Sequence, residues 1–269
     1  MTKLAGFPMY DIPEIRSATD QFWRALRNQL IARNIGEVPL NLTQPTDLPA
    51  FWQDRQLLIG QTCGYPLMLG LCGSARYVAT PCYATRFSDG PNHKSVIIAN
   101  RGAIIKNLQD AKGRVCAINM ADSNTGMNLL RLEIAKLGIK APFFSRVFET
   151  HAHRRSMSAV ATGEADIAAI DCVTFSLIER EDPDLVRHLQ IIQETEESPA
   201  LPFITSPDTD DATLHSLRDA LMTVTRDPYS RPACDQMLLN SISVLPQGAY
   251  NRIPDIENRA IALGYPKLA

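Results

Sequence analysis

The fold class of this sequence follows from one stretch, RVCAINMADSNTGMNLLRLEIAKLG, Arg114–Gly138. Its first part is an apolar run typical of a buried strand, and its last part has apolar residues at helical spacing as far as Leu137. The polar cluster Ser123–Gly126 separates the two parts. A strand that leads through a short polar turn into a helix predicts a βα unit, the building block of α/β folds.

The polar cluster, which consists of Ser123, Asn124, Thr125 and Gly126, has two possible roles. Ser, Asn and Thr are ordinary N-cap residues, so the cluster serves in part to start the helix. The first N–H groups of a helix also lack intrahelical partners and lie at the positive end of its dipole, where they bind anions. Three capping-type residues before a glycine exceed the needs of one cap, which favours a site for a phosphate-like anion. The glycine patterns of the phosphate loop and of the dinucleotide fold are absent, which argues against a nucleotide site of either type.

Apolar runs and amphipathic stretches alternate along the chain, which predicts βαβ units and mainly parallel sheets flanked by helices. We expect strands at residues 3–10, 38–44, 57–67, 75–84, 95–100, 114–119, 143–150, 165–172 and 189–195. We expect helices at residues 11–33, 108–111, 123–137, 156–163, 173–181, 211–225 and 254–263.

The pattern restarts near Asn100, and a proline-rich segment follows near Pro199. These two points suggest two lobes joined by two crossings of the chain. The first lobe is discontinuous and comprises residues 1–100 and 195–269, and the second comprises residues 101–194. In open α/β sheets, ligands bind beyond the carboxyl ends of the strands. We therefore expect a ligand cleft between the lobes, lined by residues at strand ends.

In the first lobe, the strand ends carry Tyr10, Thr62, Tyr65 and Tyr83. Buried tyrosines are often core residues whose hydroxyls find partners. Tyr10 and Tyr83 stand where strands end, which favours contact with a ligand, whereas Tyr65 precedes a proline in a turn and has packing as its alternative role. We include all four residues in the predicted ligand site.

In the second lobe, His153 precedes a short helix and Asp171 ends the apolar run ADIAAID. His153, Arg154 and Arg155 form a basic loop that suits an anion, and a solvated turn is the alternative. A buried carboxylate at Asp171 is costly unless it is paired or hydrogen-bonded. It can bond backbone amides or a hinge residue, or accept a hydrogen bond from a ligand.

The composition excludes several classes of protein. Of the 269 residues, 45% are hydrophobic and 21% are charged, as in a globular chain, and the net charge of -2 does not attract nucleic acid. No apolar run reaches the roughly 18 residues that a membrane span needs. The six cysteines form no C-x-x-C pair and no histidine cluster has zinc spacing, so we expect no metal and no cofactor.

The first residues lack the features of a secretory leader. We therefore expect a periplasmic or extracytoplasmic protein if a leader was removed, and a cytoplasmic one if the sequence is complete.

Five segments carry a resemblance to a known family: FPMYDIPEI, LIGQTCGYPL, INMADSNTGMNLLR, FFSRVFETHAHRRSMSAVATGEADIAAIDCVTF and ESPALPFIT. Together, in order from about Leu4 to Thr205, they resemble the phosphate/phosphonate-type solute-binding proteins of ABC transporters. The resemblance implies the two-lobed type 2 periplasmic-binding-protein fold, a small anionic ligand and an ABC-transporter permease as partner.

The resemblance also implies roles for single residues. The helix start at Ser123, Asn124 and Thr125 corresponds to the run that holds phosphonate or phosphate oxygens in the family, although Asn124 stands where a hydroxyl is usual. His153 corresponds to the histidine of the following loop. Tyr10 or Tyr65, and Tyr83, correspond to tyrosines of the first lobe. Asp171 corresponds to an acidic residue that contacts the amine of aminophosphonates.

Two other functions fit the same fold. One is a cytoplasmic enzyme, with Cys172, His153 and Asp171 as its candidate groups, and the other is an intracellular ligand sensor whose partner recognises the ligand-bound form. We favour a binding protein without catalytic residues that closes on a phosphonate, a phosphate or a phosphate ester for ABC-type uptake.

Overall fold

The computed structural model describes residues 3–139 and 141–269, and the chain forms two compact units. The first unit comprises Met1–Asn92 and Pro199–Tyr250, and the second comprises His93–Ser198 and Asn251–Ala269. The chain therefore passes between the units three times, where we expected two passages. The last segment, which we expected in the first lobe, lies in the second unit.

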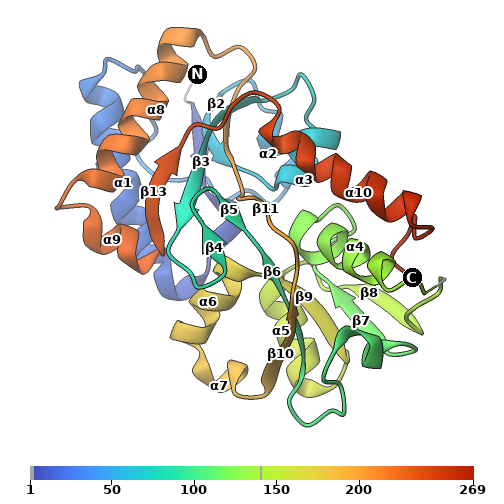
Figure 1. Cartoon of the computed structure of the whole chain (residues 1–269). Helices are drawn as coiled ribbons and strands as arrows, with labels where there is room; N and C mark the ends of the chain where they lie inside the picture. Colours follow the sequence, from blue (N-terminus) through green and yellow to red (C-terminus); the bar gives the residue numbers. More distant parts are fainter. Residues whose placement is uncertain (1–2, 140) are drawn as a thin grey trace. The chain divides into compact units, whose positions relative to one another are not determined.

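The first unit contains a five-stranded sheet (Figure 1). Its strands, in spatial order, are β1 (Leu4–Gly6), β2 (Leu57–Gln61), β12 (Phe203–Thr205), β3 (Arg76–Tyr83) and β13 (Leu239–Ser243). β1 is parallel to β2, whereas β12 is antiparallel to both β2 and β3, and β13 is antiparallel to β3. The helices of this unit are α1 (Arg16–Ala32), α2 (Leu48–Trp52), α3 (Gly64–Leu69), α8 (Asp211–Arg226) and α9 (Arg231–Gln236), with 3-10 turns at η1 (Pro8–Tyr10), η2 (Pro13–Ile15) and η5 (Ala249–Asn251).

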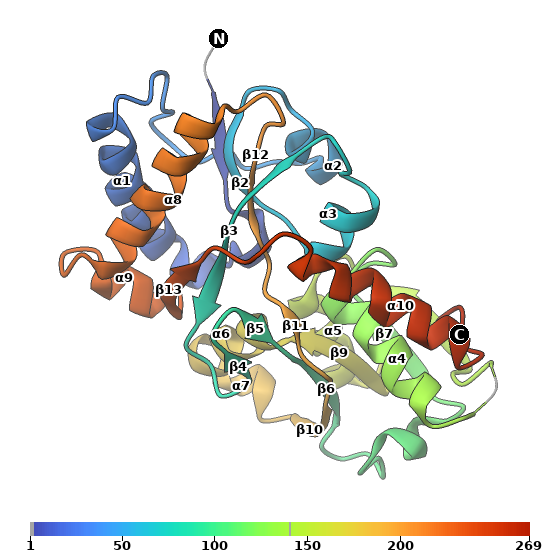
Figure 2. The ribbon, with the colours of Figure 1, turned by 45° about the horizontal axis from the view of Figure 1, so that its top comes forward.

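Apolar patterning explains these elements. Every residue of β2 is buried, as expected of a central strand. α1 and α8 lie side by side (Figures 1 and 2). Each is amphipathic, and α1 buries Phe22, Leu26 and Leu30 along one face while α8 buries Leu217 and Leu221. These two helices cover one part of the core of the first unit, and in another part Phe51 and Trp52 of α2 pack against Leu57 and Ile204 of the sheet.

Three expectations for the first unit are wrong in detail. Residues 38–44 form no strand; the carbonyls of Pro39 and Leu40 accept hydrogen bonds from side chains of α1 instead of from a neighbouring strand. β1 ends at Gly6, because Pro8 opens the 3-10 turn η1. α1 begins at Arg16 rather than at residue 11, after the 3-10 turn that Pro13 starts.

The second unit contains another five-stranded sheet. Its strands, in spatial order, are β10 (Leu189–Glu194), β6 (Ser95–Asn100), β9 (Ile167–Asp171), β7 (Val115–Ile118) and β8 (Arg146–Glu149). Its helices are η3 (Leu108–Ala111), the π-turn η4 (Asn124–Asn128), α4 (Leu129–Lys136), α5 (His153–Thr162), α6 (Cys172–Glu181), α7 (Pro183–Val186) and α10 (Arg252–Ala262). Short strands β4 (Ser88–Asp89), β5 (Asn92–His93) and β11 (Ser198–Pro199) lie close to two of the passages between the units in sequence.

Both sheets are mixed, whereas we expected mainly parallel ones. In the second unit, β7 pairs in parallel with β8 and β9, but β6 is antiparallel to both β9 and β10. Parallel neighbours need a crossover connection, and α4 and α5 provide crossovers between β7, β8 and β9. β6 is the first main strand after the chain enters the unit and β10 is the last before it leaves, so neither is joined to its neighbour by such a helix. The α/β class that we predicted is confirmed.

α10 lies beside α4 in the second unit (Figures 1 and 2). Its buried residues, Ile253, Ile256 and Ala260, recur at helical spacing on one face. At the end of the segment, the carbonyl of Ala269 accepts hydrogen bonds from the N–H groups of Phe143 and Phe144. These contacts explain why the last residues belong to this unit.

Candidate functional site

The polar cluster that follows β7 forms the start of a helix, as predicted. Ser123 is the N-cap, and its hydroxyl accepts a hydrogen bond from the Gly126 N–H at 3.0 Å. The first turn is a π-turn, because the N–H of Asn128 bonds the carbonyl of Ser123, five residues back, at 3.0 Å. π-turns are rare and occur often at functional sites. We call the segment Ser123–Asn128 the anion turn, since the leading N–H groups of η4 and α4 lie at the positive end of the helix dipole.

Thr125 connects the anion turn to two other elements. Its hydroxyl lies 3.1 Å from Nε2 of His153, at the start of α5, and its carbonyl accepts a hydrogen bond of 2.8 Å from the hydroxyl of Ser95, at the start of β6. Gly126 leaves room for this arrangement. A Cβ on Gly126 would lie 1.8 Å from Oδ1 of Asn119 and 3.2 Å from Cε1 of His153. Only glycine permits this close approach of the anion turn to β7 and α5.

Asn124 is bonded at both ends of its side chain. Its amide nitrogen donates to the hydroxyl of Ser198 at 2.9 Å, and its amide oxygen accepts from the Asn128 side chain at 3.1 Å. Asn128 in turn accepts from Arg131 at 2.7 Å, and Arg131 pairs with Glu257 of α10 at 3.1 Å. The side chain of Asn124 therefore anchors the anion turn within the protein.

His153 is the first residue of α5, and the neighbouring basic residues separate from it. Its Nδ1 atom is buried without a hydrogen-bond partner. Burial lowers the pKa of His153, and the negative charge of Asp171 opposes this effect. Arg154 pairs with Asp182 at 2.7 Å, and Arg155 and His151 are exposed. Of this predicted basic loop, the structure brings only His153 to the anion turn.

Asp171 ends β9 and caps α6. Its Oδ1 accepts hydrogen bonds from the N–H groups of Val173 and Thr174 at 2.9 and 3.0 Å. Its Oδ2 lies 3.4 Å from Nδ1 of His93, and both side chains are only 1% exposed. Of the roles left open by the sequence, bonding to backbone amides is therefore present.

The sequence did not single out His93. It lies in the short strand β5, two residues before Ser95. In an extended segment, residues i and i+2 point to the same face, and Ser95 contacts the anion turn. The spacing of His93 and Ser95 could therefore have placed His93 near the anion turn. It would have done so only if the contact of Ser95 with the anion turn were already known.

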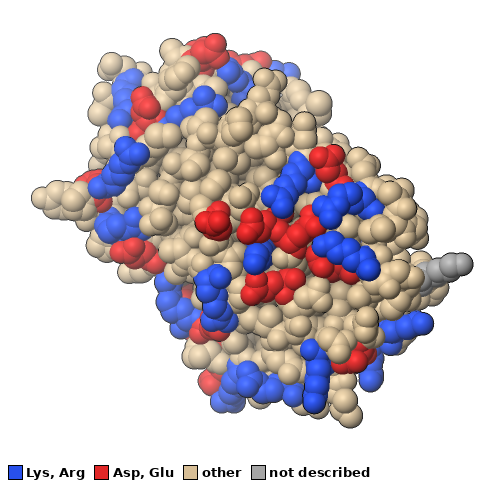
Figure 3. Space-filling view, in the orientation of Figure 1, with Lys and Arg blue, Asp and Glu red and all other residues tan. Residues whose placement is uncertain are grey.

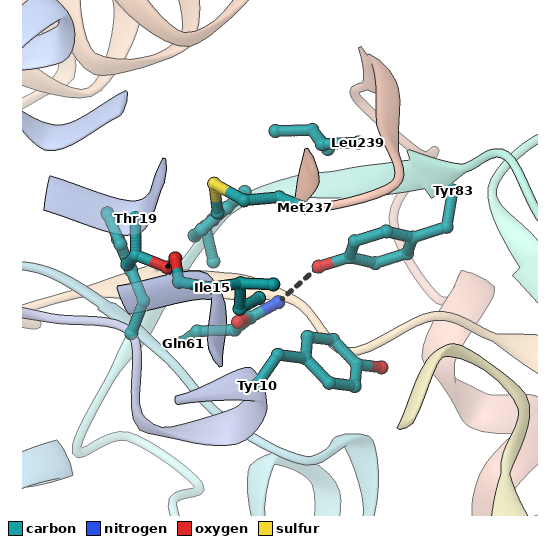
Figure 4. A pocket seen from close by; sticks show the side chains of 9 residues that line it. Tyr10, Ile15, Thr19, Gln61, Tyr83, Met237 and Leu239 are labelled. Carbon is teal, nitrogen blue, oxygen red and sulfur yellow. Dashed lines mark hydrogen bonds between the residues drawn. The ribbon is translucent and has the colours of Figure 1, made fainter. Parts of the chain in front are cut away.

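The remaining predicted residues lie in the first unit. Tyr10 and Tyr83 are buried, and their rings meet edge to face with centroids 5.2 Å apart. Gln61 donates to the Tyr83 hydroxyl at 3.1 Å (Figure 4). Thr62 is buried after β2, and Tyr65 lies half-buried in α3.

A small pocket lies beside this pair of tyrosines (Figure 4). Its volume is about 10 Å³, about what a single water molecule needs. The residues that line it are Phe7, Tyr10, Ile15, Thr19, Gln61, Tyr83, Phe203, Met237 and Leu239. This pocket by itself is too small for an organic ligand.

The surface charges and the cysteines are two further features of the described residues that bear on function. On the face shown in Figure 3, basic and acidic side chains are mixed rather than gathered into a patch of one sign. Within residues 3–139 and 141–269, no group of three or more His, Cys, Asp or Glu side chains is suited to a metal ion. Of the cysteines in apolar stretches of the sequence, which we expected to be buried, Cys116 and Cys172 are buried, whereas Cys72 is exposed. In the same described residues, no helix combines the length and apolarity that crossing a bilayer requires.

Comparisons with known proteins agree with the predicted resemblance. A family model described as "ABC transporter, phosphonate, periplasmic substrate-binding protein" matches residues 63–264. A search of curated protein sequences gives no significant match.

Solved structures share the fold. A binding protein component of an ABC phosphonate transporter from Pseudomonas aeruginosa has a TM-score of 0.80 at 16% identity, over 97% of this chain and 87% of that chain. PhnD1 from Prochlorococcus marinus, in complex with methylphosphonate, has a TM-score of 0.75 at 13% identity, over 96% and 97%. A Xanthomonas citri protein bound to ATP has a TM-score of 0.72 at 17% identity, over 97% and 98%.

These likenesses to solved structures establish the fold, and the family model covers most of the chain, including the anion turn, His153 and Asp171. The chain therefore belongs to the family of periplasmic substrate-binding proteins of phosphonate ABC transporters.

Proposed function

We propose that this protein binds a small phosphonate, phosphate or phosphate ester and delivers it to an ABC-transporter permease. The observation that carries the proposal is the anion turn, where a helix start, two hydroxyl residues and the imidazole of His153 lie together in one unit. The methylphosphonate complex of the Prochlorococcus marinus protein supports this class of ligand. Membership of a family of periplasmic proteins supports a location outside the cytoplasmic membrane.

We propose that backbone and side-chain donors of the anion turn form the hydrogen bonds that hold the anion. The N–H groups of Asn124 and Thr125 occupy the first turn, where intrahelical acceptors are lacking. The hydroxyl of Thr125 and Nε2 of His153 share one hydrogen bond. When the proton of that bond lies on Nε2, the O–H of Thr125 donates to one oxyanion. The hydroxyl of Ser123 is already an acceptor for Gly126, and it keeps its own O–H to donate.

We propose that Tyr10, Thr62, Tyr65 and Tyr83 of the first unit also contribute to ligand affinity. The hydroxyl of Tyr83 accepts a hydrogen bond from Gln61 at 3.1 Å. In Figure 4 the hydroxyl of Tyr10 points away from the Gln61–Tyr83 bond. We propose that Asp171 acts in the site through its negative charge, because its Oδ1 already accepts two backbone hydrogen bonds at the start of α6.

We propose binding without catalysis, in place of the enzyme that the fold also permits. The groups that an enzyme would use are occupied by structural contacts: Asp171 caps a helix, and Cys172 is fully buried in α6. Incubation with a bound phosphonate followed by phosphorus NMR tests this point. Appearance of a new phosphorus species, abolished by Cys172→Ala, would favour the enzyme.

Isothermal titration calorimetry tests the ligand class. The protein is titrated with methylphosphonate, inorganic phosphate, a phosphate monoester, methanesulfonate and ATP, the last because a solved protein of the same fold binds it. We expect saturable binding of at least one phosphorus oxyanion. We also expect a large loss of affinity in Thr125→Ala, with Thr213→Ala on α8 of the first unit as a matched control. Absence of binding by every anion would refute the proposal.

A further inference from the structure

His93 is a buried histidine without hydrogen bonds. Its side chain is 1% exposed, and neither ring nitrogen has a hydrogen-bond partner among the described residues. Buried polar groups are nearly always hydrogen-bonded, since an unpaired one retains the full cost of its desolvation. A ring in the interior whose two nitrogens make no hydrogen bond needs an explanation, although Nδ1 lies 3.4 Å from Oδ2 of Asp171.

The fold places His93 beside the anion turn. Ser95, two residues further along the chain, donates to the carbonyl of Thr125 and pairs in register with Asp171 of the neighbouring strand. Asp171 lies 3.4 Å from His93, and its charge also acts on His153. His153 contacts Thr125 directly. His93 and Asp171, which are buried, and His153, which is half-buried, therefore form one cluster against the anion turn, which we call the histidine cluster.

The charge of the histidine cluster is poorly suited to an anion when both rings are neutral. Burial lowers the pKa of His93 and of His153 below the usual 6.5, with Asp171 opposing the shift in both cases. Both rings are therefore neutral near pH 7. Oδ1 of Asp171 accepts hydrogen bonds from two backbone N–H groups. The cluster then carries one negative charge next to the place proposed for a second one.

Other charges do not offset it. Among the described residues, the titratable groups that act on the two rings are Asp171 and the rings themselves. Lys94, which follows His93, pairs with Glu194 at 2.9 Å. Arg154, which follows His153, pairs with Asp182. One proton on His93 would pair its charge with Asp171 and remove the net negative charge from the cluster.

We propose that His93 takes up a proton when the anion binds, so that the histidine cluster selects doubly charged phosphonates over singly charged sulfonates. This inference rests on the proposed function, because it assumes that the anion turn holds the ligand. A bound dianion raises the affinity of the cluster for a proton, and by linkage the proton raises the affinity for the dianion by the same factor. A monoanion provides half the charge and a weaker coupling.

The pH dependence follows from the two states. In the free protein the pKa of His93 is lowered, and in the complex the ligand raises it. Affinity therefore increases as the pH falls through the pKa of the complex, and it stops increasing below the pKa of the free protein. Uptake of one full proton gives a roughly tenfold change in Kd per pH unit. We expect a total gain of roughly 5- to 150-fold, the usual range of coupling between two sites.

Calorimetry in two buffers with different ionisation enthalpies measures the uptake. Methylphosphonate is titrated at pH 6, 7 and 8 into the wild-type protein, into His93→Gln and into His215→Gln, a matched control in which an exposed histidine of α8 is changed. The ligand itself titrates near neutrality, and His93→Gln corrects for that contribution. We expect up to one more proton taken up by the wild-type protein and by the control than by His93→Gln. We also expect the preference for methylphosphonate over methanesulfonate to fall in His93→Gln.

A second measurement uses the wild-type protein alone, in case His93→Gln does not fold. The imidazole resonances are followed by NMR during pH titration, with and without saturating methylphosphonate. An imidazole that titrates at higher pH in the complex, and that is none of His151, His153, His188 and His215, supports the proposal. Binding of methylphosphonate with equal proton uptake in the wild type and His93→Gln, or without any upward shift, overturns it. Absence of binding by methylphosphonate, by phosphate and by the other anions of the calorimetric series would refute the proposed function instead.

Discussion

Substitution of Gly126 by alanine tests the close packing of the anion turn. The added Cβ would lie 1.8 Å from Oδ1 and 2.9 Å from Cγ of Asn119. Ordinary contacts between heavy atoms begin near 3.5 Å, so the side chain of Asn119 or the turn itself must move by roughly 1.5 Å. The same Cβ lies 3.2 Å from Cε1 of His153, whose ring must move by a few tenths of an ångström and so disturb its contact with Thr125.

The expected stability change is the sum of two opposing effects. Alanine is a better helix former than glycine by about 1 kcal/mol, whereas overpacking of a well-packed site costs about 1–3 kcal/mol. Gly126→Ala should therefore lower the free energy of unfolding by about 0–2 kcal/mol. Adding Asn119→Ala removes the main clash, and Oδ1 of Asn119 has no hydrogen bond to lose. The double variant should then be about as stable as the wild type or more stable.

Affinity should behave differently from stability. The contact with His153 persists in the double variant, so we expect weaker methylphosphonate binding in both Gly126→Ala and the double variant. Urea unfolding and calorimetry measure the two quantities separately. Gly36→Ala is the matched control, because an added Cβ there meets no atom within 4 Å. Wild-type affinity in Gly126→Ala, together with wild-type stability, would refute the claim that the anion turn needs a glycine.

Three further predictions concern single side chains. Ser123→Ala removes the cap on Gly126 and should lower the free energy of unfolding by about 0.5–2 kcal/mol; no change in urea unfolding would contradict the cap. Burial raises the pKa of Glu196, but hydrogen bonds from basic side chains outweigh it and hold the pKa below its usual 4.5. Its stabilisation is therefore present above pH 4.5 and is lost as the pH falls through the lower pKa of the folded protein. Glu196→Gln should make the unfolding midpoint less dependent on pH in that acidic range. Tyr83→Phe removes one of the two acceptors of the Gln61 amide nitrogen and should cost about 0.5–1.5 kcal/mol of stability, with an additional loss of ligand affinity that calorimetry measures.

The parts of the fold that were predicted correctly have strong local signals. The run ADIAAIDCVTFSLIERE predicted β9 and α6 correctly. A strand that is buried on both faces is apolar throughout, and the helix that follows it has an apolar face. The antiparallel strands β12 and β13 were missed, since their partners lie far away in sequence. α10 was predicted as a helix, but its apolar face does not indicate which part of the protein it packs against.

The candidate site shows the same division between local and distant information. The start of a helix at Ser123 is visible in the sequence, because capping residues act on their own backbone. That Thr125 meets His153 required only the rule that strand ends gather at one edge of a sheet. The burial of His93 beside Asp171 depends on the register of β6 against β9, and no pattern within either segment specifies that register.

Asn124 shows how a residue type can mislead when its partners are unknown. As a replacement for a hydroxyl, it suggested one fewer side-chain contact to the anion. In the structure its side chain donates a hydrogen bond to Ser198 and accepts one from Asn128. These two bonds need a donor and an acceptor on the same side chain. Because Ser198 belongs to β11, where the chain leaves the second unit, the amide fixes the anion turn to that segment before any ligand arrives. A turn held in this way loses little entropy on binding, so Asn124 can favour affinity by positioning the backbone N–H groups rather than by touching the ligand with its side chain.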